Sequence, residues 1–180
     1  MLTIAKLCAF VALQTFSAHT PKYTPLDDMS PSYQAKWKKR YMKSKVEECK
    51  RLFDLAKHQP ELQKAKRLKL KRHEYLWVLA TAVVESALSN HVVSSKGAKS
   101  SMQTYRKYSP CKTCDLRVAG IYHSVRYLRK YGACSAAAKY NAGPNGECTG
   151  LGSKYATKVL MVYERICAED GIECPIDWGC

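Results

Sequence analysis

Apolar residues recur at helical spacing in the first part of this chain. Ser30 followed by Pro31 is typical of a helix start, because serine caps the first turn and proline fits the first helical position. Aromatic and aliphatic residues then recur about every four positions until Pro60 interrupts the pattern. The pattern therefore predicts a helix over residues 31–58 and a second helix that begins at Pro60.

The most hydrophobic stretch after the N-terminus covers residues 74–90. It is apolar nearly all round, which predicts a buried central helix rather than a surface one. Asp115 can cap a further helix that runs to Tyr131, and Gly132 provides its C-terminal stop.

The last part of the chain continues the helical pattern. We predict a short helix over residues 135–140 and a last helix that is capped by Ser153 and ended by Gly171. Residues 91–108 are the one loop-like stretch that could hold a small hairpin. Little else alternates as a strand would, so the fold class is mainly α.

The N-terminus resembles a secretory signal peptide. Residues 1–18 hold a short apolar core that is preceded by Lys6 and followed by small residues, which predicts cleavage near Ala18. The alternatives are a retained N-terminal anchor or an ordinary buried segment. After this segment we expect a polar arm and basic helical extension over residues 19–72 and one domain over residues 73–180.

The chain has nine cysteines, so removal of Cys8 with a signal peptide would leave an even number. Export together with paired cysteines favours four disulfides, whose connectivity the sequence leaves open. Cys111 and Cys114 have the spacing of a redox motif or of half a zinc site, which His123 and Cys134 could complete. Structural disulfides are the favoured interpretation, and we expect no metal and no cofactor.

Thirty Lys and Arg against fifteen Asp and Glu give a net charge of +15. Residues 36–72 hold fifteen of these cations and four acids, a net of +11. Such charge implies an anionic partner, and we expect an anionic wall polymer or a membrane surface. Nucleic acid is not expected, because no zinc-finger, RRM or helix-turn-helix signature is present. A polytopic membrane protein is excluded, since no apolar run reaches about 18 residues.

Glu85 is the only charged residue between Tyr75 and Lys96, and it lies near the end of the predicted buried helix. Burial disfavours the ionised carboxylate, so the pKa of Glu85 should be raised. A protonated carboxyl in an apolar pocket is what a glycosidase uses as its general acid. The alternative is a buried glutamate that hydrogen bonds or an arginine satisfy.

Three short motifs follow one another along the chain, and the first of them contains Glu85. They are Glu85-Ser86, the segment from Ser94 to Gln103, and the segment from Ala138 to Pro144 that contains Tyr140-Asn141. Together they resemble the soluble lytic transglycosylase family, which reads E-S, then S-x-x-G-A-x-G-L-M-Q, then A-x-Y-N-A-G-P. Weaker similarity to the family in residues 120–128 and 155–159 extends the resemblance over about residues 72–165.

Some positions depart from the family motifs. Ser100-Ser101 stand where the family has Gly-Leu, and Gly120 and Ser124 stand where its middle helix has Asn and Gly. These changes could reshape the wall of the substrate groove. They leave Glu85 and the Tyr-Asn pair in place.

The resemblance implies a mainly α, lysozyme-like (SLT) domain with a basic N-terminal helical extension. It implies that Glu85 is the catalytic residue and that six others contact the substrate or assist: Ser86, Met102, Gln103, Tyr140, Asn141 and Tyr155. Each has a plainer interpretation. Met102 and Tyr155 could be core residues alone, and Gln103 and Asn141 could be structural hydrogen-bonders.

The implied activity is lytic transglycosylation of peptidoglycan, in which the bond between N-acetylmuramic acid and N-acetylglucosamine is cleaved with formation of a 1,6-anhydro ring. One carboxyl suffices for this reaction, and no Asp or Glu occurs from Ser86 to Cys114. The alternatives are a hydrolytic muramidase that uses Asp115 or Glu147, and a non-catalytic wall- or nucleic-acid-binding module on the same fold. We expect export to a periplasm or the extracellular space, or association with a virion.

Overall fold

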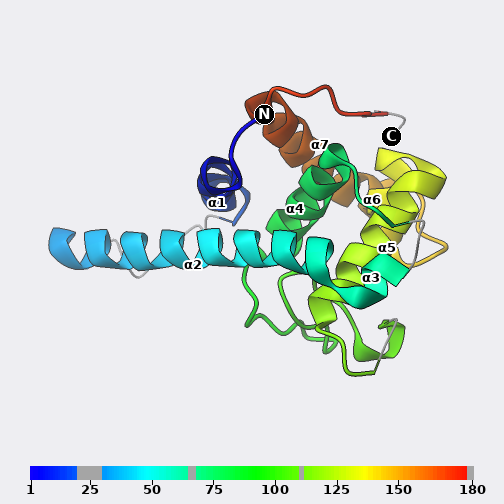
Figure 1. The fold of residues 1–180 in the computed structure, drawn as a ribbon, viewed down its shortest axis with the longest axis horizontal. Coiled ribbons are helices and arrows are strands. Elements are labelled where there is room, and N and C mark those ends of the chain that lie inside the picture. The colour runs from blue at the N-terminus through cyan, green and yellow to red at the C-terminus, as the bar shows by residue number, and fades with distance from the viewer. Residues whose placement is uncertain (20–29, 65–67, 110–111, 178–180) are drawn as a thin grey trace.

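The computed structural model describes residues 1–19, 30–64, 68–109 and 112–177. These residues form seven α-helices and one short 3₁₀ helix, so the prediction of a mainly α fold is confirmed. In chain order the elements are α1 (Ile4–His19), α2 (Pro31–His58), α3 (Pro60–Lys64), α4 (Arg72–Ser86), η1 (Arg106–Tyr108), α5 (Leu116–Tyr131), α6 (Ala133–Ala142) and α7 (Gly150–Asp170). Figure 1 shows their arrangement.

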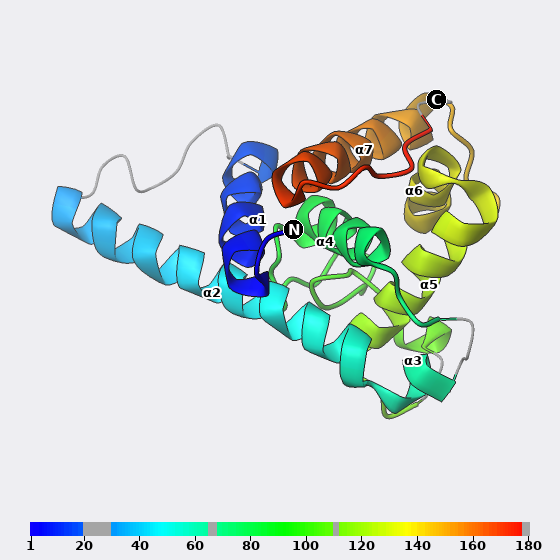
Figure 2. The same cartoon turned by 45° about the horizontal axis from the view of Figure 1, so that its top comes forward.

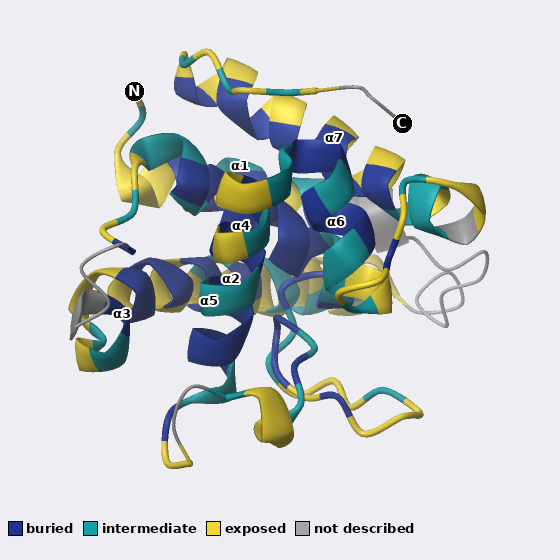
Figure 3. Cartoon of the chain, turned by 90° about the vertical axis from the view of Figure 1, so that its right-hand side faces the viewer, coloured by how far each residue is buried: buried dark blue, intermediate teal, exposed yellow. Residues whose placement is uncertain are grey.

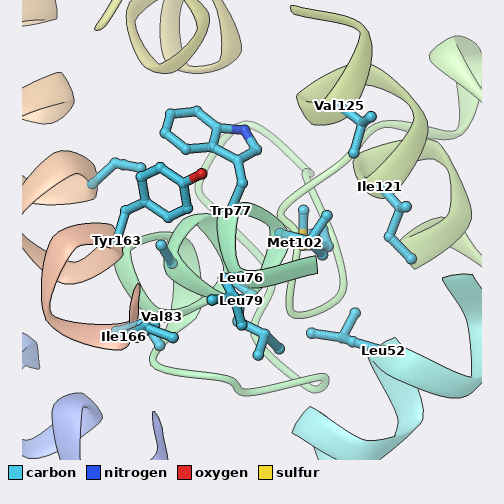
Figure 4. Close-up of a cluster of buried hydrophobic side chains, with 14 of the residues drawn as sticks. Leu52, Leu76, Trp77, Leu79, Val83, Met102, Ile121, Val125, Tyr163 and Ile166 are labelled. Carbon is cyan, nitrogen blue, oxygen red and sulfur yellow. The ribbon is translucent and has the colours of Figure 1, made fainter. Parts of the chain in front are cut away.

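Helix α4 lies at the centre of the molecule. It packs against α1, α2, α5 and α7, which explains why its sequence is apolar nearly all round. Trp77 is its largest buried residue; its indole Nε1 donates to the carbonyl of Ser124 at 3.2 Å, and its ring meets Tyr163 edge-on at 5.2 Å (Figure 4). The surrounding helices turn their buried residues inward and their exposed residues to solvent (Figure 3).

Local signals set some of the helix ends and not others. Asp115 caps α5 by accepting from the backbone N–H of Arg117 at 3.0 Å, and Gly132 ends it with φ +76°, as predicted. Helix α7 begins at Gly150 after Thr149, so the prediction that Ser153 caps it is wrong. Glycine is unfavourable in helix interiors, so Gly150 and Gly152 in the first turn of α7 predicted a loop.

Helix α2 has two different halves. Its first half extends away from the other described helices in both views of the fold (Figures 1 and 2). Its second half packs into the same hydrophobic cluster as α4, and its buried apolar residues are Cys49, Leu52, Phe53, Leu55 and Ala56. The basic extension and the domain that we expected to divide at residue 73 therefore differ in charge, but they share one hydrophobic core.

The N-terminal segment forms α1, which packs against α2, α4 and α7. Leu7, Cys8 and Val11 are fully buried, and Cys8 is bonded to Cys49. This arrangement matches the alternative of an ordinary buried segment, while cleavage near Ala18 stays a prediction. The expectation that the cysteines after Cys8 pair only among themselves is wrong, because Cys49 pairs with Cys8.

Disulfides also link Cys134 to Cys148 and Cys167 to Cys174, and Cys114 is disulfide-bonded too. None of the cysteines in the described part of the chain is free, which fits an oxidising compartment. Within those residues no group of His, Cys, Asp and Glu is placed to hold a metal ion, and Cys111 lies outside them. No described helix is both long and apolar enough to span a bilayer.

The C-terminal tail runs back from α7 toward α6 (Figure 1). The carboxylate of Asp177 accepts from the backbone N–H groups of Ala133 and Cys134 at 2.7 and 3.1 Å. A side chain at Gly132 would collide with this carboxylate, at 2.2 Å from Cβ to oxygen. A residue outside α6 thus caps its first turn, since Gly132 has no side chain to do so.

The disulfide between α1 and α2 should contribute more to stability than the one at the end of α7. It joins residues 41 apart, against 7 for the other pair, so it restricts the unfolded chain more. By loop entropy, replacing Cys8 and Cys49 with alanine should lower the free energy of unfolding by about 4 kcal/mol, and replacing Cys167 and Cys174 by about 2 kcal/mol. Urea unfolding of the two double variants measures the difference. A larger loss for the short loop would contradict the chain-entropy argument.

Candidate active site

Glu85 lies in the last turn of α4, just before the chain reverses. The helix ends at Ser86, and Ala87 and Leu88 then adopt the left-handed conformation with φ of 51° and 55°. Such values cost non-glycine residues free energy, and here the burial of Leu88 at 1% exposure offsets the strain. The reversal sends the chain into the loop that carries Met102 and Gln103.

The Glu85 carboxyl group accepts a hydrogen bond from the hydroxyl of Tyr155 in α7, at 2.5 Å from Oε1. Burial raises the pKa of Glu85 to about 7, and the Tyr155 hydrogen bond opposes this only in part. The prediction that burial raises this pKa agrees with the structure. Near neutrality the group exists in both protonation states.

Two tyrosines lie close enough to this carboxyl group for its charge to shift their pKa values. Burial, and then the charge of Glu85, raise the pKa of both Tyr140 and Tyr155 well above the ordinary value. Both phenols therefore keep their protons at any physiological pH and act as donors. Tyr155 donates to Glu85, and Tyr140 donates to the backbone carbonyl of Met102 at 2.7 Å.

Glu85 differs from the other buried carboxylates among the described residues. Glu74 pairs with Arg129, Asp170 with Arg72, and Glu48 with Arg117. Hydrogen bonds from Arg72 hold the pKa of Asp170 below its usual range. Glu85 has a neutral tyrosine in place of an arginine, so no cation of the described residues pairs with its charge when the proton leaves.

Ser86 ties the end of α4 to the following loop. Its hydroxyl lies 2.8 Å from the carbonyl oxygen of Ser101, to which it donates, and accepts from the backbone N–H of Ser89 at 3.0 Å. The side chain is buried, so it braces the turn beside Glu85.

Met102 and Gln103 follow their plainer interpretations. Met102 is fully buried and belongs to the core cluster. The amide nitrogen of Gln103 donates to the carbonyl oxygens of Val92 and Ser100 at 3.0 Å each, which holds the loop together. Asn141 lies exposed in the last turn of α6. The structure thus brings Glu85 and Tyr155 together, joins Tyr140 to the backbone of the loop, and leaves Asn141 at the surface.

The packing around residue 120 explains why the chain has glycine where the family motif has asparagine. A Cβ atom at this position would lie 2.3 Å from Cβ of Met102 and 2.8 Å from the hydroxyl oxygen of Tyr140. Helix α5 can approach the loop and α6 this closely only because residue 120 has no side chain. The sequence showed the substitution but not the neighbours that require it.

The two carboxylates considered for a hydrolytic reaction have other positions. Asp115 caps α5, as predicted, and it also forms an ion pair with Arg117. Glu147 is exposed in the loop before α7. Glu48 is not among the residues that the motifs predict, yet it is buried and contacts Ser101. The sequence signal for it is its position four residues before Leu52, on the apolar face of α2.

Comparisons of the chain with models of protein families, with curated proteins and with solved structures find no match. The motif resemblance and the geometry around Glu85 therefore carry the functional argument.

The raised pKa of Glu85 makes a stability prediction. The folded state holds this proton more tightly than the unfolded state, so stability falls as pH rises from 4.5 to about 7. Glutamine cannot ionise, yet its carbonyl can still accept from Tyr155. Between pH 4 and pH 8 the free energy of unfolding of Glu85→Gln should therefore rise by about 3 kcal/mol relative to that of wild type. Urea unfolding at both pH values measures this change. A pH-independent difference between the two proteins would mean that the pKa of Glu85 is ordinary.

Proposed function

We propose that the protein is a lytic transglycosylase of lysozyme-like fold that cleaves peptidoglycan with one carboxyl group, that of Glu85. The observation that carries this proposal is a partly buried carboxyl that no cation of the described residues pairs with, with a pKa of about 7 and a tyrosine hydrogen bond. The three family motifs lie in the order expected around it.

The reaction uses Glu85 first as an acid and then as a base. The protonated carboxyl donates to the glycosidic oxygen between N-acetylmuramic acid and N-acetylglucosamine, and the bond from C1 to this oxygen breaks. The carboxylate then takes the proton of the C6 hydroxyl, whose oxygen bonds to C1 and closes the 1,6-anhydro ring. Glu85 ends protonated, as it began, and no water is consumed. A pKa near the working pH suits a group that must give and take one proton in the same cycle.

Tyr155 gives this carboxyl a fixed orientation. Its hydroxyl donates to Oε1, which leaves Oε2 as the oxygen that carries the proton. The hydrogen bond also stabilises the carboxylate between the two steps, without the strong lowering of the pKa that an arginine would cause.

Hydrolysis by most glycosidases uses a second carboxylate that activates water or attacks the sugar. Asp115 is paired with Arg117, and the sequence offers no acid from Ser86 to Cys114. Burial and Tyr155 account for the pKa of Glu85, with no contribution from another carboxylate of the described residues. These points favour transglycosylation over a hydrolytic muramidase.

The first half of α2 supplies a surface for the anionic wall. Its exposed lysines include Lys36, Lys38, Lys39 and Lys43, on a helix that stands away from the other described helices. Long-range attraction of this kind concentrates an enzyme on a polyanionic substrate without taking part in the chemistry.

The central test is the product formed from purified sacculi. Wild type should release anhydromuramoyl fragments, and Glu85→Gln should lose roughly 10²–10⁴-fold in rate, because the amide cannot donate the proton. Mass spectrometry distinguishes anhydro ends from the reducing ends that hydrolysis leaves. The matched variant Glu147→Gln removes the exposed carboxyl of the hydrolytic alternative and should keep wild-type rate and products. Reducing ends that disappear with Glu147→Gln would establish a muramidase instead.

A separate test addresses the basic helix. Two sets of four lysines are changed to glutamine so that both variants lose equal charge. The test set is Lys36, Lys38, Lys39 and Lys43, and the control set is Lys96, Lys112, Lys154 and Lys158, all of them exposed. The test variant should bind sacculi more weakly and with less salt dependence, because these interactions are screened over about 8 Å at physiological salt. It should cleave a short soluble glycan normally. Equal loss of binding in both variants would remove the specific role of α2.

A further inference from the structure

A buried cluster of polar groups joins α2 to α5 and to the loop beside Glu85. Oε1 of Glu48 accepts from the hydroxyl of Ser101 at 2.5 Å, and Oε2 accepts from Nη1 of Arg117 at 2.7 Å. Ser101 is fully buried and Glu48 is 8% exposed. Both carboxylate oxygens of Glu48 are thus committed, one to the loop and one to α5.

The same loop residue is connected to the candidate catalytic group. The carbonyl oxygen of Ser101 accepts from the hydroxyl of Ser86, the neighbour of Glu85, at 2.8 Å. The next carbonyl along the loop, that of Met102, accepts from Tyr140 at 2.7 Å. A path of three residues, Glu48, Ser101 and Ser86, therefore leads from the middle of α2 to the end of α4.

The backbone of this loop needs such support. Ser100 and Gln103 adopt positive φ values of 74° and 46°, a conformation that side chains with a Cβ atom avoid. Strained backbone of this kind persists only where surrounding contacts hold it. Ser101 lies between the two strained residues, and its hydroxyl is anchored by Glu48.

We propose that Glu48 is a positioning residue that acts through the Ser101 hydroxyl to hold the loop and Ser86 in the geometry that Glu85 needs. The inference rests on the proposed function of Glu85. It also gives a reason for a departure from the family motif, in which leucine occupies the position of Ser101. A leucine there would leave a buried carboxylate oxygen of Glu48 without a donor, so Ser101 and Glu48 form a matched pair in this chain.

Three variants test the pair. Ser101→Ala removes the hydroxyl, Glu48→Gln removes the charge, and Glu47→Gln is the control. Glu47 is the preceding residue of α2, and its exposed side chain forms an ion pair with Lys43 at 3.9 Å. Small displacements of a catalytic group can cost about 10²-fold in rate. We expect both test variants to lower kcat at least about tenfold on a short soluble glycan while KM changes less, and the control to match wild type.

The double variant shows whether the two residues act through one interaction. If they do, Ser101→Ala combined with Glu48→Gln should lower kcat no more than the stronger single change. Multiplied effects would mean that Glu48 and Ser101 act separately, and would overturn the proposal.

A measurement that needs no activity separates this inference from the proposed function. The pKa of Glu85 is measured by NMR with carbon-labelled glutamate in wild type, Ser101→Ala and Glu47→Gln. A loosened loop admits water to the carboxyl group, so Ser101→Ala should bring the pKa of Glu85 down toward its ordinary value. If wild type cleaves no glycan but this shift occurs, the proposed function fails and the positioning role stands. If wild type is active and Ser101→Ala changes neither kcat nor the pKa of Glu85, the positioning role is wrong. Loss of kcat with an unchanged pKa of Glu85 would assign Ser101 a purely structural role and would also overturn it.

Discussion

The cost of burying a carboxyl group without a countercharge governs the arrangement around α4. Desolvation of Glu85 favours the protonated form, and only a neutral phenol from α7 moderates it. Glu74 and Asp170 show how the fold stabilises an ionised buried carboxylate, whereas burial keeps the pKa of Glu48 raised in spite of Arg117. Burial works against ionisation of Glu74, yet the hydrogen bonds of Arg129 bring its pKa below the usual range. Each of the buried acids Glu48, Glu74 and Asp170 thus has an arginine partner, and Glu85 has none among the described residues.

Holding an uncompensated carboxyl in place requires several elements at once. Helix α4 supplies the group, α7 supplies Tyr155, and α6 supplies Tyr140, which fixes the loop through Met102. The close approach of α5 at Gly120 lets these parts meet. Helix α2 belongs to this set as well, although its charge suggested an appendage. Its outer half is basic and exposed, and its inner half carries Glu48 and part of the core.

The sequence predicted what is encoded locally. Residues 31–58 and the helix from Asp115 to Gly132 were placed correctly, because proline, aspartate and glycine mark helix ends within a few positions. Glu85 was found because it stands alone in an apolar stretch. The contacts of Glu48 with Ser101 and Arg117 span 53 and 69 residues, and no local pattern reports such a distance. The orientation of Gln103 also depends on a loop whose backbone strain is set by tertiary packing.

The start of the described chain and the end of α7 meet at one ion pair. The backbone N–H of Leu2 donates to Asp170, 168 residues later, and Arg72 contacts both the carboxylate of Asp170 and the carbonyl of Leu2. During synthesis the ribosome must release the chain through Asp170 before this contact with Leu2 can form. Until then the apolar side of α1 has no α7 to pack against, and a nascent chain with exposed apolar surface is prone to aggregate. Contacts so distant in sequence carry a loop-closure cost in entropy, which slows folding.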